Sequence, residues 1–290
     1  MRSFEEVSGR WLACLSTYRS LRDVQKYKAT LRRYVLPIIG SKTIENLDPA
    51  DCAKVLANAQ SENQRFGLAR ILKSILRWHF GEVPLYLRPV LKVRQPRPLT
   101  QTLSLEEQRQ LLQFAANNLD CDFGLGILLL WGCGLRIGEL LGLRYEDFNS
   151  ADNSLILRRS FSNGEVKALK AGSSEWRVLI PQIAVQFMKN NRKGWVFPAA
   201  INSKRPLSLS TAHAKFFNTL RAAGVSRVKV HSFRHAWVTR MLDAGAPFKA
   251  VQVQGGWASY KTPLDTYYRY SDGNLQAISE INEKFLGGVK

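Results

Sequence analysis

The chain is poor in cysteine and in acidic residues, and it lacks any apolar run that could cross a membrane. Its four cysteines show neither metal-ligand spacing nor a disulfide pattern, so we expect them to be reduced. The longest apolar stretch, residues 125–133, is far shorter than the roughly 20 residues of a membrane-spanning helix. The N-terminal residues lack the apolar core of a signal peptide. These absences exclude a disulfide-stabilised secreted module and predict a soluble, cytoplasmic protein without membrane partners.

Acidic residues are scarce relative to basic ones. The 42 Lys and Arg outnumber 23 Asp and Glu, which gives a formal net charge of +19. Because 45% of the residues are hydrophobic, the chain can form a folded core, and the charge is not that of a disordered tail. A folded protein with this charge favours a polyanionic partner, and nucleic acid is the first candidate.

Apolar residues at helical spacing predict four helices in the first 91 residues. The first covers residues 4–15 and the fourth about 66–80. We expect the second to run from residue 21 until Pro37 and Gly40 stop it, and the third to begin at the Asp48–Pro49 cap. The residues expected to face inward in the second and fourth helices are Leu21, Val24, Leu31, Val35, Leu68, Leu72, Ile75 and Leu76.

The second and fourth helices also carry basic stripes opposite their apolar faces. One stripe alone is as well explained by a solvated surface. Two stripes in one small domain of a basic protein favour contacts with a phosphate backbone. The candidate DNA-binding residues are Arg22, Lys26 and Arg33 on the second helix, and Arg70, Lys73 and Arg77 on the fourth.

A basic stretch broken by two prolines, KVRQPRPLT, separates this helical region from the rest of the chain. We therefore expect a helical domain at residues 1–91, a linker at 92–103 and a second domain at 104–290. Ser104 and Glu107 have the form of a capping box that opens a helix, and a buried helix follows at about 123–131.

The second domain is expected to contain a small antiparallel β-sheet. The runs LILRRSF, VKALK and EWRVLI are separated by the turn sequences SNG and AGSS, and Lys170 lies at the second turn. Helices resume near residues 181, 210 and 231. The predicted fold class is mainly α with a small antiparallel sheet.

Groups suited to phosphodiester chemistry follow one another in this domain. Arg136 lies among glycines with Glu139 one helical turn later, and His231 and Arg234 share one helix face, where they can reach the same anion. The motif His-x-x-Arg-His at residues 231–235 has no third ligand at metal-site spacing, so we expect no metal. Each group alone is better explained by an ion pair, a solvated charge or a core aromatic, and only their order favours a shared site. Candidate nucleophiles are Tyr260, Tyr267, Tyr268 and Tyr270.

In this order the motifs resemble the tyrosine recombinases, or phage integrase family, over nearly the whole chain. GCGLRIGELLGLRYEDF is similar to the first-arginine box and HSFRHAWVTRML to the His-x-x-Arg box. LDTY is similar to the nucleophile box and gives Tyr267, with Tyr268 as a rival in the YYRY run. Gly-Gly-Trp stands where Leu-Gly-His is usual, so Trp257 replaces a histidine, as in Cre-like members. Indole donates one hydrogen bond and cannot shuttle a proton.

The resemblance implies a helical, SAM-like core-binding domain followed by a tyrosine-recombinase catalytic domain, in a compact Cre- or Xer-like form without an arm-binding domain. It implies that the chain cleaves and rejoins DNA through a 3′-phosphotyrosine, without metal, ATP or other cofactor. The implied roles are phosphate clamps for Arg136 and Arg234, donors for His231 and Trp257, nucleophile for Tyr267, general acid for Lys170, candidate base for His231, and support for Glu139.

The implied partners are double-stranded DNA with inverted-repeat core sites and further copies of the chain, expected to form a tetramer on DNA in the nucleoid. A short helix with Leu275, Ile278, Ile281 and Phe285 on one side is expected to dock on a neighbouring protomer, or else to close its own domain. Three alternatives share parts of this pattern: a type IB topoisomerase-like nicking-closing enzyme, a non-catalytic DNA-binding protein of the same fold, and, more distantly, a phosphodiesterase.

Overall fold

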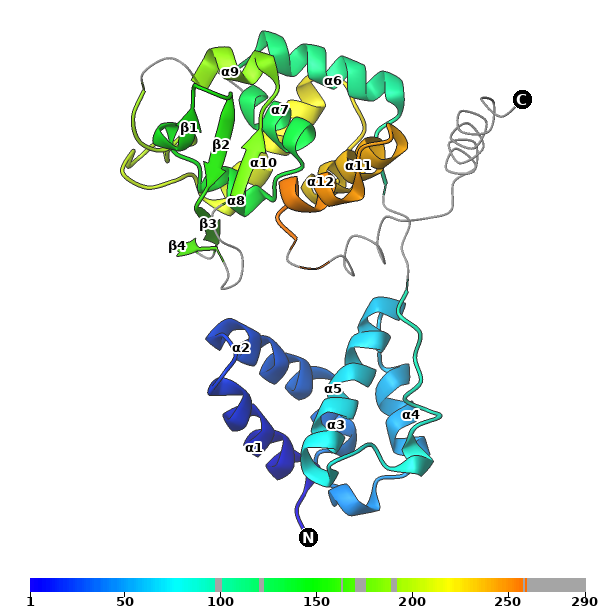
Figure 1. Cartoon of the computed structure of the whole chain (residues 1–290). Helices are drawn as coiled ribbons and strands as arrows, with labels where there is room; N and C mark the ends of the chain where they lie inside the picture. The colour runs from blue at the N-terminus through cyan, green and yellow to red at the C-terminus, as the bar shows by residue number, and fades with distance from the viewer. Residues whose placement is uncertain are drawn as a thin grey trace, which may run out of the picture. The chain divides into compact units, whose positions relative to one another are not determined.

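A computed structural model describes residues 1–96, 101–119, 123–162, 164–169, 176–188, 192–257 and 259. The chain divides into two compact units, Met1–Leu99 and Thr100–Lys290, each of which is described by itself. Both are rich in helices, and the second also contains short antiparallel strands (Figure 1). The predicted fold class, mainly α with a small antiparallel component, is confirmed. No helix among the described residues is long and apolar enough to cross a membrane.

The first unit is a small helical domain with its own core. Asp48 caps α4, as the sequence predicts, and Asp51 completes a capping box that the sequence analysis did not predict. Ser61 caps α5, which begins four residues earlier than expected. The core includes Phe4, Trp11, Leu72 and Ile75. The elements are α1 (Phe4–Ser16), α2 (Leu21–Thr30), a π-helical turn (Leu31–Val35), α3 (Leu36–Ile39), a 3-10 turn (Ile44–Asn46), α4 (Pro49–Ala57), α5 (Glu62–Phe80) and a second 3-10 turn (Leu85–Leu87).

The second predicted helix differs from the expectation in two ways. Leu21 is 72% exposed, and α2 buries no residue, so burial on this segment begins only at Leu31. Pro37 does not stop the helix. The π-helical turn lets the Leu36 N–H bond to the Leu31 carbonyl, and Pro37 falls in the first turn of α3, where a missing N–H costs little. The helix ends at Gly40.

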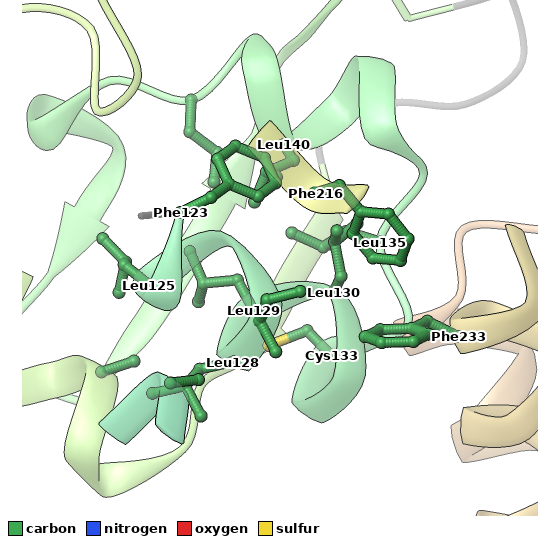
Figure 2. Packing of buried hydrophobic residues seen from close by; sticks show 14 of the residues in the cluster. Phe123, Leu125, Leu128, Leu129, Leu130, Cys133, Leu135, Leu140, Phe216 and Phe233 are labelled. Atoms are coloured by element: carbon green, nitrogen blue, oxygen red, sulfur yellow. The ribbon is translucent and has the colours of Figure 1, made fainter. Parts of the chain in front are cut away.

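The second unit is built around α7, which is apolar all round and buried on nearly every side (Figure 2). Ser104 and Glu107 form the predicted capping box at the start of α6. Phe216 of α10 and Phe233 of α11 pack edge-to-face in the same core. The helices are α6 (Leu105–Asn117), α7 (Gly124–Cys133), α8 (Ile137–Leu141), α9 (Gln182–Met188), α10 (Leu209–Ala222), α11 (Val230–Asp243) and α12 (Phe248–Gln254).

The described strands form two small antiparallel sheets, where the sequence predicted one. The run that begins at Ser154 changes pairing partner at Arg158, because Arg159 is held elsewhere. Its guanidinium bonds the buried carboxylate of Asp147 at 2.7 and 3.2 Å, which ties the start of the next strand to the 3-10 turn Tyr145–Asp147. The strands are β1 (Phe148–Asn149), β2 (Ser154–Leu157) and β5 (Trp176–Leu179) in the order β1-β2-β5, and β3 (Arg159–Ser162) paired with β4 (Glu165–Ala168).

Candidate active site

Arg136 occupies the junction between α7 and α8. The chain turns at Gly134 with φ +66°, and a Cβ there would lie 2.3 Å from the Trp237 ring, so this position requires glycine. The Glu139 carboxylate accepts hydrogen bonds from the Arg136 backbone N–H at 2.8 Å and from Arg136 Nη1 at 2.5 Å. Glu139 is buried, whereas the Arg136 side chain is 43% exposed. Glu139 therefore holds the guanidinium in place while much of the Arg136 side chain stays exposed.

Arg234, on the second turn of α11, is buried and joins three segments of the unit. Its side chain is 2% exposed. Nη1 donates to the Gly134 carbonyl at 2.7 Å, and Nη2 donates to the Gly255 carbonyl at 2.5 Å. The guanidinium also lies 3.9 Å from Glu139 Oε2 and stacks 3.9 Å from the centre of the Trp257 ring. One planar fork thus links the α7–α8 junction to the turn after α12.

The turn that carries Trp257 depends on both preceding glycines. Gly256 has φ +64°, and a Cβ there would lie 2.4 Å from Trp176 of β5. A Cβ at Gly255 would lie 1.8 Å from the Trp257 ring itself. Gln252 completes the turn by donating to the Trp257 carbonyl at 2.9 Å. The Gly-Gly pair in the sequence signals such close packing, but only the fold identifies Trp176 as the packing partner.

His231 lies in an exposed position on α11, about one helical turn before Arg234. Desolvation lowers the pKa of His231 below its ordinary value, and the positive charges of Arg234 and Arg136 lower it further. His235 packs edge-on against His231 with ring centroids 4.7 Å apart. The pKa of His235 is also lowered, first by desolvation and then by the charges of its neighbours. His231 is therefore mainly neutral at pH 7, where it can accept a proton or a hydrogen bond.

Five of the predicted site residues come together in this unit: Arg136, Glu139, His231, Arg234 and Trp257. Arg136 and His231 both line one cavity. The described part of the chain contains no group of three or more His, Cys, Asp or Glu that could hold a metal. Lys170, Tyr260, Tyr267, Tyr268 and Tyr270 lie outside the described residues, as do Leu275, Ile278, Ile281 and Phe285.

The predicted DNA-binding residues belong to the first unit. Their side chains are exposed on α2, the π-helical turn and α5, except that of Lys73, which is half-buried. The sequence did not single out two further residues, His213 and Lys229, which line the cavity next to Arg136 and His231. No motif marks either residue, since one lies in the middle of α10 and the other precedes α11.

Known proteins resemble the chain in both sequence and fold. Tyrosine recombinase XerA of Pyrococcus furiosus is 29% identical over 67% of this chain and 66% of that protein, so the chain spans just under two thirds of that relative. Tyrosine recombinase XerC of Brucella melitensis is 27% identical over 94% of this chain and 92% of that protein. The Tn1549 transposon integrase in complex with transposon right end DNA has the same fold, with a TM-score of 0.79, 16% identity and coverage of 97% and 99%.

A family model described as the phage integrase family matches residues 101–273, which is more than half of the chain. The matched segment contains the arginine junction, the α11 turn and the Gly-Gly-Trp turn described above. The chain belongs to the phage integrase family, the tyrosine recombinases.

Proposed function

We propose that this tyrosine recombinase cleaves and rejoins DNA at specific sites through a 3′-phosphotyrosine on Tyr267. The observation that carries the proposal is the arrangement around Glu139. This buried carboxylate fixes Arg136, whose partly exposed side chain lines the same cavity as His231. An exposed guanidinium in a fixed position is suited to the non-bridging oxygens of a phosphodiester.

The chemistry requires positioning and charge stabilisation more than covalent help from other side chains. In-line attack concentrates negative charge on the non-bridging oxygens, and donors held in place beforehand stabilise that charge without reorganising. Arg136 makes the direct contact, and Arg234 adds a nearby positive charge while it holds the two turns in place. Direct contact between Arg234 and the phosphate requires the buried guanidinium to become accessible.

Tyr267 and Lys170 complete the proposed reaction. The Tyr267 oxygen attacks phosphorus, the bond to O5′ breaks, and the leaving oxygen takes a proton from Lys170 as general acid. Neutral His231 is the candidate acceptor of the tyrosine proton. The phosphotyrosine bond retains the energy of the cleaved bond, so a 5′-hydroxyl from another strand can reverse the step. Neither ATP nor a metal takes part.

The proposed partner is duplex DNA bearing inverted-repeat core sites. The Tn1549 transposon integrase, which has this fold, is in complex with transposon right end DNA, and a lambda integrase dimer of similar fold is bound to a COC′ core site (TM-score 0.65, 15% identity). The net charge of +19 fits such a partner. We propose that the chain assembles as a tetramer on paired sites, with both units contacting DNA.

A topoisomerase-like nicking-closing enzyme and a non-catalytic DNA-binding protein remain the competing functions. The first would relax DNA without exchanging strands between two sites. The second would bind DNA and form no covalent bond. A recombination assay with paired sites therefore separates the first from a recombinase, and covalent trapping separates the second.

The decisive experiment is covalent trapping on a nicked duplex that carries the cognate site, found by selection from random DNA. In EDTA and without ATP, the protein should form an adduct at the 3′ phosphate. Tyr267→Phe should bind the DNA with unchanged affinity and form no adduct, whereas Tyr268→Phe should form it. An adduct with Tyr267→Phe but none with Tyr268→Phe would identify Tyr268, and not Tyr267, as the nucleophile. No adduct with any form of the protein would reject the cleavage mechanism.

A further inference from the structure

A cavity of about 460 Å³ opens beside the candidate active site. Three segments that are distant in sequence form its wall: the α7–α8 junction, the middle of α10 and the start of α11. Arg136 and His231 occupy one part of the wall, and His213 and Lys229 occupy another. The volume lies within the range of sites that bind small organic molecules, so the cavity has room for more than one phosphate group. The remaining lining residues are Leu135, Ile137, Phe217 and Val230.

The charges around the cavity favour a second anion. No carboxylate lines it among the described residues, and within that part of the chain neither His213 nor Lys229 pairs with one. Arg227 adds a further cation nearby, stacked 4.3 Å from the centre of the Phe217 ring. Lys229 is also the residue before α11, where the first N–H groups of the helix contribute partial positive charge. The cavity itself is lined by four donor side chains, those of Arg136, His213, Lys229 and His231, and the rest of its lining is apolar.

Successive phosphates of one DNA strand fit this combination. They follow one another about every 3.4 Å along the helix axis, with an apolar deoxyribose between them. If Arg136 and His231 hold the phosphate to be cleaved, the next phosphate lies within reach of the same cavity. The apolar lining offers a surface for the intervening sugar.

We propose that this cavity binds the phosphodiester next to the scissile one, with Lys229 and His213 as its cationic and hydrogen-bonding groups. The proposal rests on the proposed function, because Arg136 and His231 must hold the scissile phosphate. It assigns a DNA contact to α10 and to the start of α11 that the family motifs do not mark. Lys229 contributes chiefly a charge, and His213 can donate an N–H in either protonation state.

The test combines protein variants with DNA that carries one neutral methylphosphonate. Dissociation constants are measured over a range of salt concentrations on a suicide duplex, for the unchanged protein and for Lys229→Ala, Lys229→Arg and His213→Gln. Lys215→Ala, also exposed on α10 but away from the cavity lining, is the matched control. The methylphosphonate is placed in turn at each phosphate flanking the scissile one and at a distant phosphate.

On unmodified DNA, Lys229→Ala should reduce the slope of log Kd against log salt concentration by about 0.9, the value for one lost phosphate contact. On DNA with one particular flanking phosphate neutralised, Lys229→Ala and His213→Gln should bind as the unchanged protein does. Lys229→Arg should retain the slope. Unaltered melting temperatures would show that these exposed positions leave folding intact.

Lys229 is coupled to a phosphate if Lys229→Ala no longer weakens binding once that phosphate is neutral. The proposal is overturned if Lys229→Ala is coupled to neither flanking phosphate, or is coupled equally to the distant one. It is also overturned if Lys215→Ala gives the same loss of slope, because the effect is then general electrostatics. Adduct formation by the unchanged protein is scored in the same reactions. Coupling without an adduct would reject the cleavage mechanism and support the binding site. An adduct without coupling would support the cleavage mechanism and reject the binding site.

Discussion

Replacing Arg234 by lysine should cost this protein stability, although the charge is kept. Arg234 donates from two nitrogens to two backbone carbonyls that belong to different turns, those of Gly134 and Gly255. Lysine has one nitrogen on a flexible stem, and it cannot serve both carbonyls from within this buried space. At least one buried carbonyl is then left without its donor, and the guanidinium no longer stacks on Trp257.

The size of the effect follows from these two losses. An unsatisfied buried acceptor costs about 1–3 kcal/mol, and a desolvated cation–π contact contributes about 0.5–2 kcal/mol. A destabilisation of about 3 kcal/mol lowers the melting temperature of a domain of this size by about 6–12 °C. Calorimetry of the transition that belongs to the second unit measures the shift directly.

Arg136→Lys is the matched control for this prediction. The Arg136 side chain is 43% exposed, and a lysine there can still pair with Glu139, so stability should change by less than about 1 kcal/mol. The rate of adduct formation should nevertheless fall by a factor of about 10²–10³, the cost of losing a donor to a developing oxyanion. An Arg234→Lys protein that melts like the unchanged one, yet no longer cleaves DNA, would refute the structural role assigned to Arg234.

Two further predictions test the same site. Because the folded protein lowers the pKa of His231 below its ordinary value, the folded state binds fewer protons there than the unfolded state does. This contribution to the free energy of unfolding is present above about pH 6.5 and is lost as the pH falls below it. His231→Gln should therefore make the free energy of unfolding depend less on pH, measured by denaturant titrations at pH 5–8. An identical pH dependence in the two proteins would contradict the prediction. In Gly256→Ala, the new Cβ is strained by the left-handed backbone and also clashes with the Trp176 indole. In Gly245→Ala, where φ is +79° and the space around the Cβ is open, only the backbone strain remains. Gly245→Ala should therefore cost about 1 kcal/mol and Gly256→Ala clearly more, and equal melting temperatures for the two variants would show that the indole can move aside.

The sequence predicted those features whose cause is local. The caps at Asp48 and Ser104 were recognisable because each depends on residues within four positions: Asp48 precedes a proline at the first helical position, and Ser104 forms a capping box with Glu107. The pairing of Arg136 with Glu139 was expected for the same reason, since the two residues lie one helical turn apart. The buried helix α7 followed from an apolar run without a polar face.

Features that depend on distant contacts were not recognisable. The exposure of Leu21 depends on where the core of the first unit ends, and the split of the sheet at Arg158 depends on the bond between Arg159 and Asp147. The role of Arg234 is of the same kind. Its two carbonyl partners lie 100 and 21 residues away in the chain, so no spacing in the sequence reports them.

The two arginines look equivalent in the motifs, yet the fold assigns them different roles around one carboxylate. Glu139 compensates for one guanidinium, because it bonds Arg136 directly and lies 3.9 Å from Arg234. Desolvation lowers the pKa of His231, and the positive charges of Arg234 and Arg136 lower it further. A phosphodiester carries one negative charge, which suits the partly exposed guanidinium of Arg136. Attack by a tyrosine oxygen adds negative charge at the same point, so the attraction grows toward the transition state. In the proposed reaction, the guanidinium of Arg136 therefore stabilises the transition state more than the bound substrate.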